Sequence, residues 1–112
     1  MECLFCKIAR GEVPATIVYQ DETCVAFSDI DPRSPVHLLV VPREHIPSLA
    51  AVDAEHEPLL GHLLHVVSKI ATEKKLTAGF RVVVNTGVEG GQTLPHLHLH
   101  LLGGRAMHWP PG

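Results

Sequence analysis

Three histidines alternate with apolar residues near the end of the chain, in the run PHLHLHL of residues 95–101. An imidazole can act as a nucleophile, a proton carrier or a metal ligand near neutral pH. If the run is a strand, alternation places His96, His98 and His100 on one face and the leucines on the other. Neighbours on one face lie about 7 Å apart, close enough to address one phosphate group or to share one ligand.

Two kinds of chemistry are open to such a cluster: metal binding, and nucleophilic catalysis in which an imidazole attacks phosphorus and water then hydrolyses the phosphohistidine. No carboxylate follows Glu89, so the run lacks a nearby acidic metal ligand. The preceding segment GGQT, residues 90–93, offers backbone N–H groups, an amide and a hydroxyl that suit an anion. Phosphate chemistry is therefore favoured. A purely structural role is not, because three adjacent imidazoles cannot all find partners in an apolar interior.

A second group of reactive side chains lies at the start of the chain. Cys3 and Cys6 have the spacing of half a zinc site, which two histidines would complete. The alternative is a pair of reduced, half-buried thiols on a short helix. The chain has three cysteines, an odd number that argues against a closed disulfide framework, and we expect the third, Cys24, to lie in the core.

The elements that must position these residues follow from hydrophobic periodicity. We predict a short helix over 3–10 and a long helix over 53–76 with Asp53 as its N-cap. The predicted strands are 16–19, 23–28, 36–41, 80–85 and 95–101, and the first two form a hairpin. The sequence therefore predicts a single α+β domain over 1–112, with a five-stranded antiparallel sheet, one long helix and one short helix.

Composition excludes several partners. The 112 residues carry 9 Lys+Arg against 12 Asp+Glu, the net charge is -3, and the five arginines are scattered without a stripe that could follow a phosphate backbone. We expect no polymeric nucleic acid as a partner. No apolar run approaches the roughly 20 residues that cross a bilayer, and the first residues do not resemble a signal peptide. We expect a cytoplasmic protein that does not enter membranes.

The run of residues 96–102 resembles the His-x-His-x-His-x-x motif of the histidine triad (HIT) superfamily, and the likeness extends over nearly the whole chain. It includes the segments FCKIA at 5–9, FSDIDP at 27–32, HLLVVP at 37–42, GGQT at 90–93 and LGGRAMHWPPG at 102–112. The last segment resembles the Hint branch specifically. This resemblance implies a homodimeric purine nucleoside phosphoramidase, which cleaves the phosphorus–nitrogen bond of purine nucleoside phosphoramidates and the acyl-phosphate bond of aminoacyl adenylates.

The resemblance also implies roles for the histidines. His98, the middle member of the triad that begins at His96, would be the nucleophile that takes up the nucleoside monophosphate. His100 would contact the phosphate and the leaving group, and His37 would complete the catalytic cluster from a neighbouring strand. A histidine at position 100, where nucleotidyl transferases of the superfamily carry glutamine, favours hydrolysis. One departure is the pair Leu94-Pro95, where an aromatic residue is more usual; the proline removes an N–H from the strand.

Further residues would bind the purine nucleotide. The resemblance assigns the phosphate to Asn85, Gln92 and Thr93, the ribose hydroxyls to Asp29, and the base to the apolar slot of Phe5, Ile8 and Ile30. A carboxylate suits a diol, and apolar walls suit a flat base. Plain core packing is the competing interpretation for Phe5 and Ile8, and capping of a turn is the competing one for Asp29.

For the cysteine pair, the resemblance implies a structural zinc held by Cys3, Cys6, His45 and His96, which would tie the short helix to the sheet. Catalysis itself would need no cofactor. Two other functions stay open from the sequence: hydrolysis of dinucleoside polyphosphates by the same triad, and a non-catalytic nucleotide-binding or zinc-binding module that acts through protein partners.

Overall fold

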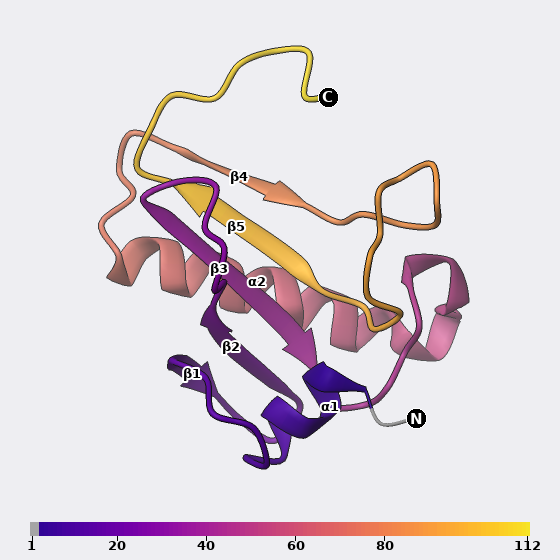
Figure 1. Cartoon of the computed structure of the whole chain (residues 1–112). Helices are drawn as coiled ribbons and strands as arrows, with labels where there is room; N and C mark the ends of the chain where they lie inside the picture. The colour runs from indigo at the N-terminus through magenta and orange to yellow at the C-terminus, as the bar shows by residue number, and fades with distance from the viewer. Residues whose placement is uncertain (1–2) are drawn as a thin grey trace.

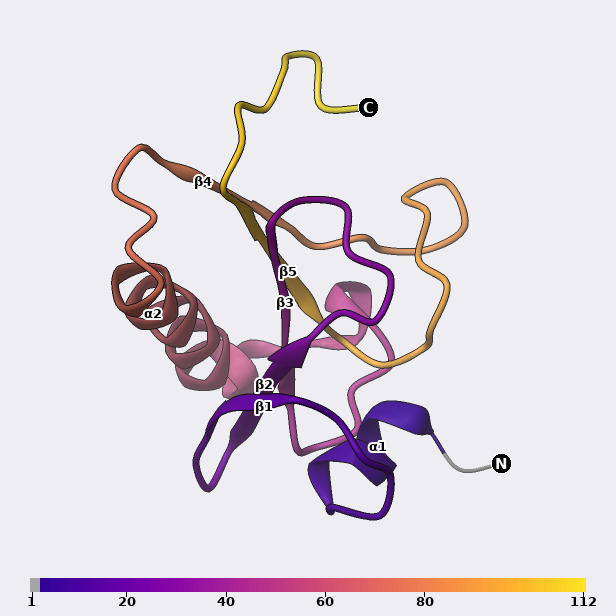
Figure 2. The same cartoon turned by 60° about the vertical axis from the view of Figure 1, so that its left-hand side comes forward.

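The computed structural model describes residues 3–112 and has one antiparallel sheet with strand order β1-β2-β3-β5-β4. Helix α2 covers one face of the sheet and the short helix α1 covers part of the other (Figures 1 and 2). The helices are α1, Leu4–Ala9, and α2, Glu57–Glu73; the strands are β1, Ile17–Gln20; β2, Cys24–Ser28; β3, Val36–Pro42; β4, Phe80–Val83; and β5, Leu99–Gly103. The predicted α+β architecture is confirmed, whereas homodimerisation stays a prediction.

The two faces of the sheet are buried separately because side chains alternate along β2 and β3. Ala26 and Val40 pack with α2 residues such as Leu63, in a cluster that also holds the three leucines of the histidine run. Phe27 and Val41 face the other way and pack with residues of α1. The side of the sheet toward α1 is therefore the side on which the histidines lie.

Helix α2 is shorter than the prediction of 53–76 at both ends. Asp53 does act as a cap, but of a 3-10 turn over Ala54–His56, where its carboxylate accepts from the N–H of Glu55 at 2.9 Å, and α2 begins only at Glu57. At the other end Lys75 takes a left-handed conformation with φ 59°, and the N–H of Leu76 bonds back into the helix. This left-handed termination returns Leu76 to the core.

The last strand starts at Leu99, four residues later than predicted. Pro95 has no N–H to give to a ladder, and the N–H of Leu97 donates instead to the carbonyl of Ile46 at 2.7 Å. Residues 95–98 therefore run beside the segment after β3 rather than in the sheet. The alternation persists nonetheless, because Leu97, Leu99 and Leu101 all remain buried against α2. Strand β4 likewise ends at Val83, two residues before the predicted end.

None of the helices within residues 3–112 combines the length and the apolar character that crossing a membrane requires.

Candidate active site and metal centre

His98 is held in one orientation by the backbone. It is 6% exposed, and its Nδ1 lies 2.7 Å from the carbonyl oxygen of His96. A carbonyl can only accept, so Nδ1 carries the hydrogen and the lone pair of the neutral ring is on Nε2. The ring also packs edge-on against Phe5, with centroids 5.1 Å apart. Nε2 is therefore the atom of His98 available to attack an electrophile.

His37 and His100 form a hydrogen-bonded chain whose direction is fixed at one end. The backbone N–H of Arg33 donates to Nδ1 of His37 at 2.9 Å, so the proton of neutral His37 is on Nε2. That nitrogen lies 2.9 Å from Nδ1 of His100 and donates to it. His100 then carries its own proton on Nε2. The hydrogen-bonded pair thus presents the Nε2–H of His100 as a donor beside His98, whose ring centroid is 5.0 Å from that of His100.

His37 and His100 are both neutral at physiological pH. Burial, together with the nearby rings of His98 and His37, lowers the pKa of His100 to about 4. Burial also lowers the pKa of His37, although the carboxylate of Asp29, 3.4 Å away, acts in the opposite direction. The donor that faces the site is therefore a neutral imidazole N–H.

A cavity of about 320 Å³ opens beside the triad, between α1 and β2. Its walls are mostly apolar, and a carboxylate and two imidazoles lie among them. It is lined by seven of the predicted site residues, namely Phe5, Ile8, Asp29, Ile30, Thr93, His98 and His100. An apolar slot with a few convergent polar groups is typical of a site for a flat, partly polar ligand.

Several of these residues also have structural tasks. Phe5 and Ile8 belong to the core on the α1 side and line the cavity as well, so core packing is confirmed for them, and contact with the base stays a prediction. One oxygen of Asp29 accepts from the N–H of Asp31 at 2.8 Å, which caps the turn, while the other faces His37. Ile30 is 98% exposed, at the mouth of the cavity.

Four predicted catalytic or nucleotide-binding residues do not line this cavity: His37, which lines a separate one, and three others described in turn. The amide of Gln92 bonds to the backbone of Gly87, Pro47 and Leu94, so this side chain braces the loop that carries Thr93. The same loop packs tightly at Gly90, where an added Cβ would lie 2.2 Å from the Thr86 carbonyl oxygen.

The second, Asn85, lies on the far side of His100, in a separate cavity. The third, His96, is fully buried, and its ring nitrogens contact Cys3 and the carbonyl of Pro42. It acts on the cavity only through its own carbonyl, which orients His98.

The four predicted zinc ligands converge at one point. Nδ1 of His96 lies 3.2 Å from Sγ of Cys3, 3.6 Å from Sγ of Cys6 and 3.2 Å from Nδ1 of His45. Zinc–sulfur and zinc–nitrogen bonds of about 2.3 and 2.0–2.1 Å put the ligand atoms of a tetrahedral site about 3.3–3.8 Å apart. Nε2 of His96 donates to the carbonyl of Pro42 at 2.9 Å, which leaves the Nδ1 lone pair for the metal. The residues present therefore fit a Cys2His2 zinc site.

Sequence reasoning missed three arginines that meet beyond His100. Arg33, Arg81 and Arg105 line the cavity that also holds Asn85. No linear pattern marks them, because they lie far apart on the loop before β3, on β4 and after β5.

Comparison with known proteins agrees with this fold. A family model described as "Scavenger mRNA decapping enzyme C-term binding" matches residues 2–108. The chain belongs to the histidine triad (HIT) superfamily.

Individual relatives are similar over nearly their full length. An uncharacterised HIT-like protein of Synechococcus elongatus is 55% identical, over 99% of this chain and 97% of its own. A 14 kDa zinc-binding protein of Zea mays is 45% identical, over 97% of this chain and 87% of its own. The crystal structure of a HIT family hydrolase from Legionella pneumophila matches with a TM-score of 0.97 and 48% identity, over 99% of this chain and all of that one.

Proposed function

We propose that the chain is a purine nucleoside phosphoramidase. It hydrolyses the phosphorus–nitrogen bond of purine nucleoside phosphoramidates, and the acyl-phosphate bond of aminoacyl adenylates, through a nucleotidyl-histidine on His98. The observation that carries the proposal is the hydrogen bond from Nδ1 of His98 to the His96 carbonyl, which leaves Nε2 free beside an apolar cavity. The similarity to a HIT family hydrolase supports it.

In the first step the Nε2 lone pair of His98 attacks phosphorus and a nitrogen–phosphorus bond forms. The bond from phosphorus to the leaving nitrogen breaks, and that nitrogen keeps the electron pair, takes a proton from solvent and departs as an amine. The N–H of His100, held by His37, donates to the phosphoryl group as charge builds on its oxygens. The neutral state of His100 keeps this donor available without placing a positive charge beside the nucleophile.

In the second step a water oxygen attacks phosphorus. The phosphorus–Nε2 bond breaks, its electron pair returns to Nε2, and the water proton that is lost goes to solvent. The products are a nucleoside monophosphate and the original His98. The backbone carbonyl of His96 stabilises the nucleotidylated ring because it accepts from Nδ1 throughout.

The cavity supplies the binding groups for the nucleotide. Phe5, Ile8 and Ile30 provide apolar contact for the purine, and Asp29 accepts from the ribose hydroxyls. Thr93 and Asn85 are placed on opposite sides of His100 and bind the phosphate, while Gln92 keeps the Thr93 loop in shape.

We also propose a structural zinc at Cys3, Cys6, His45 and His96. The metal would join α1, the segment after β3 and the start of the histidine run, and it would take no part in the chemistry. The similarity to a zinc-binding protein of Zea mays and the ligand spacing support this. A homodimer is proposed on family resemblance, and β4, an edge strand whose Phe80 is 45% exposed, is its contact surface.

The decisive experiment is hydrolysis of a fluorogenic adenosine phosphoramidate, run beside a diadenosine polyphosphate, by the wild type and by His98→Ala. Phosphoramidate turnover that disappears in the variant is the expected result. Preferential turnover of the polyphosphate would replace the proposed substrate class. Turnover of neither substrate by a protein that still binds AMP would instead indicate a nucleotide-binding module.

A further inference from the structure

A cavity of about 270 Å³ lies on the side of His100 away from the apolar slot. We call it the arginine cavity. Its basic and polar lining is Arg33, His37, Arg81, Asn85, His100 and Arg105. Three of the five arginines of the chain meet here, and the lining contains no Asp or Glu although the net charge of the chain is -3. Such a surface attracts anions.

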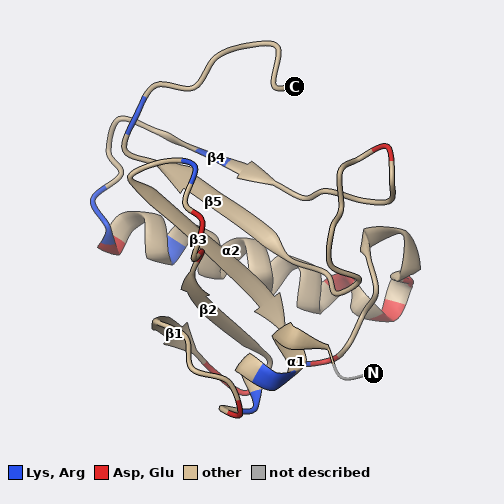
Figure 3. Cartoon of the chain, in the orientation of Figure 1, with Lys and Arg blue, Asp and Glu red and all other residues tan. Residues whose placement is uncertain are grey.

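Chain topology brings the three arginines together. Arg81 lies on β4, opposite Leu102 of β5, and Arg105 follows β5 directly after Gly104. Arg105 donates to the carbonyl of Arg33 at 3.0 Å, which fixes the loop before β3 beside it. Figure 3 shows Lys or Arg segments on β4, on this loop and at the start of the C-terminal tail, grouped at one end of the sheet.

Two of these guanidinium groups lack a carboxylate partner. Arg81 donates to the carbonyl of His108 at 2.7 Å, and Arg105 donates to backbone carbonyls; neither forms an ion pair with any Asp or Glu among residues 3–112. Arg33 pairs with Asp31, but this pair is exposed to solvent. A guanidinium satisfied only by carbonyls keeps its full charge for a ligand, and its planar fork matches a carboxylate or a phosphate.

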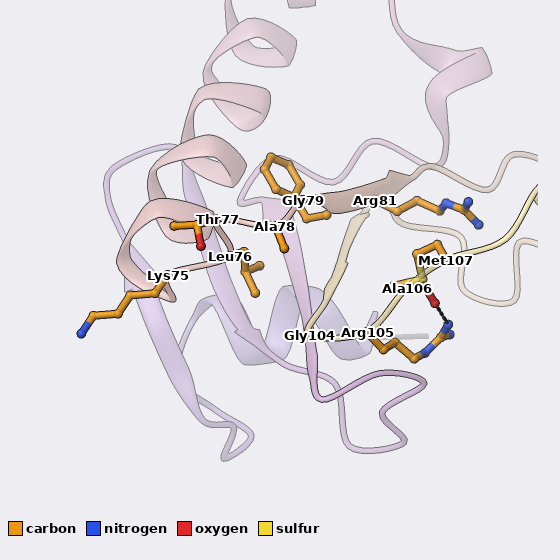
Figure 4. Close-up of a pocket in the computed structure, with 11 residues that line it drawn as sticks. Lys75, Leu76, Thr77, Ala78, Gly79, Arg81, Gly104, Arg105, Ala106 and Met107 are labelled. Carbon is orange, nitrogen blue, oxygen red and sulfur yellow. Dashed lines mark hydrogen bonds between the residues drawn. The ribbon is translucent and has the colours of Figure 1, made fainter.

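The arginine cavity and the nucleotide cavity meet at His100, which lines both of them. His98, which would form the bond to phosphorus, and Thr93 line only the nucleotide cavity, so the transferred phosphate lies on that side of His100, and Asn85 would reach it from the arginine cavity. An anion in the arginine cavity would therefore belong to the part of the substrate that leaves. A neighbouring cavity of about 540 Å³ shares Arg81, Arg105 and Met107 with the arginine cavity and is also lined by Phe80, the proposed dimer contact (Figure 4).

We propose that the arginine cavity is a leaving-group site that selects substrates whose leaving group carries an anion, either a carboxylate or a phosphate. The inference rests on the proposed function and specifies its substrate class. It predicts that, among nucleoside phosphoramidates that differ only in this charge, the anionic one is hydrolysed faster.

Two matched pairs of adenosine 5′-phosphoramidates test it. In the first pair the leaving amine is alanine, which carries a carboxylate, or alaninamide, which does not. In the second pair it is phosphoethanolamine, which carries a phosphate, or ethanolamine, which does not. We expect a ratio of kcat/KM, anionic over neutral, of at least ten in one or both pairs. The pair that shows it identifies the anion. Ratios near one in both pairs, with turnover intact, would overturn this inference and leave the proposed function standing. Absence of all turnover would overturn both.

Arginine variants assign the preference to the cavity. Arg81→Gln should bring the ratio to near one, and Arg81→Lys, which keeps the charge, should retain part of it. Arg33→Gln, whose guanidinium is exposed, provides a second variant if Arg81→Gln fails to fold. Arg10→Gln removes the same charge from an exposed ion pair with Glu12, outside both cavities, and should leave the ratio unchanged. A wild-type preference that survives in both glutamine variants would overturn the assignment.

Discussion

Nδ1 of His98 lies 2.7 Å from the carbonyl oxygen of His96, so the proposed nucleophile is oriented by the backbone of a proposed metal ligand. The two centres share one short segment of chain: the ring of His96 faces the cysteines while its carbonyl faces His98. Anything that moves His96 therefore also turns the nucleophile.

His98→Ala should abolish phosphoramidate turnover, with a loss of roughly 10³-fold or more in kcat/KM because no other group can form the covalent intermediate. AMP binding should survive, since the apolar walls and Asp29 remain. Steady-state kinetics and titration calorimetry measure the two properties. His65→Ala, an exposed histidine of α2, is the matched control. Turnover retained by the His98 variant would refute its assigned role.

The purified protein should contain about one zinc per chain, and Cys6→Ser should lose it, since tetrahedral zinc is closed by four ligands. Elemental analysis measures this directly. Cys24→Ala removes a buried thiol outside the cluster and should keep the metal. A protein purified without chelator that holds no metal would disprove the zinc site.

Removal of zinc by a chelator should lower both the melting temperature and kcat, because α1 and His96 lose their common anchor. We expect kcat to fall at least tenfold while the affinity for AMP changes less than threefold. Thermal unfolding, kinetics and calorimetry on the same sample give all three values. An unchanged kcat in metal-free protein would show that the His98–His96 bond does not need the metal.

Stability should fall as the pH is lowered from about 6.5 to about 4. The pKa of His100 is about 4 in the folded protein, where it faces His37, His98 and Asp29, and 6.5 in the unfolded chain, so the unfolded state binds the extra proton across this window. The loss amounts to at most about 3 kcal/mol of unfolding free energy. Denaturant titrations across this pH range measure it. His100→Gln should flatten the dependence, and an equal slope in that variant would assign it to other groups.

Phe80→Asp should convert the proposed homodimer to a monomer, because a carboxylate would be buried against the partner at the edge of β4. Sedimentation velocity reports the change. Val88→Asp, at a side chain that is 95% exposed in the loop after β4, is the control and should stay dimeric. A wild type that sediments as a monomer would remove the dimer from the proposal.

Local patterns predicted much of this structure. Alternation alone separated the three histidines from Leu97, Leu99 and Leu101, and the structure keeps that separation even where the strand has not yet begun. The capping role of Asp53 and the α+β fold also followed from residue types at short range.

Features that depend on distant partners could not be predicted in this way. The strand β5 starts late because Leu97 bonds to Ile46, half the chain away. The tautomer of His37 is set by a backbone N–H, that of Arg33, which no side-chain pattern reveals. The meeting of Arg81 and Arg105 depends on strand pairing and on the path of the chain after β5, so the arginines looked scattered in the sequence.

The direction of the hydrogen bonds through His37 also decides which ions the site tolerates. Asp29, His37 and His100 bring one oxygen and two nitrogens within 4.8 Å of one another, a spacing that would suit a cation. The N–H of Arg33, however, puts the proton of His37 on the nitrogen that faces this space, and His100 accepts it. A cation would have to displace that proton and break the bond between the two rings. The hydrogen bond between His37 and His100 therefore disfavours a metal ion here, whereas at the cysteine cluster Nδ1 of His96 keeps its lone pair available for one.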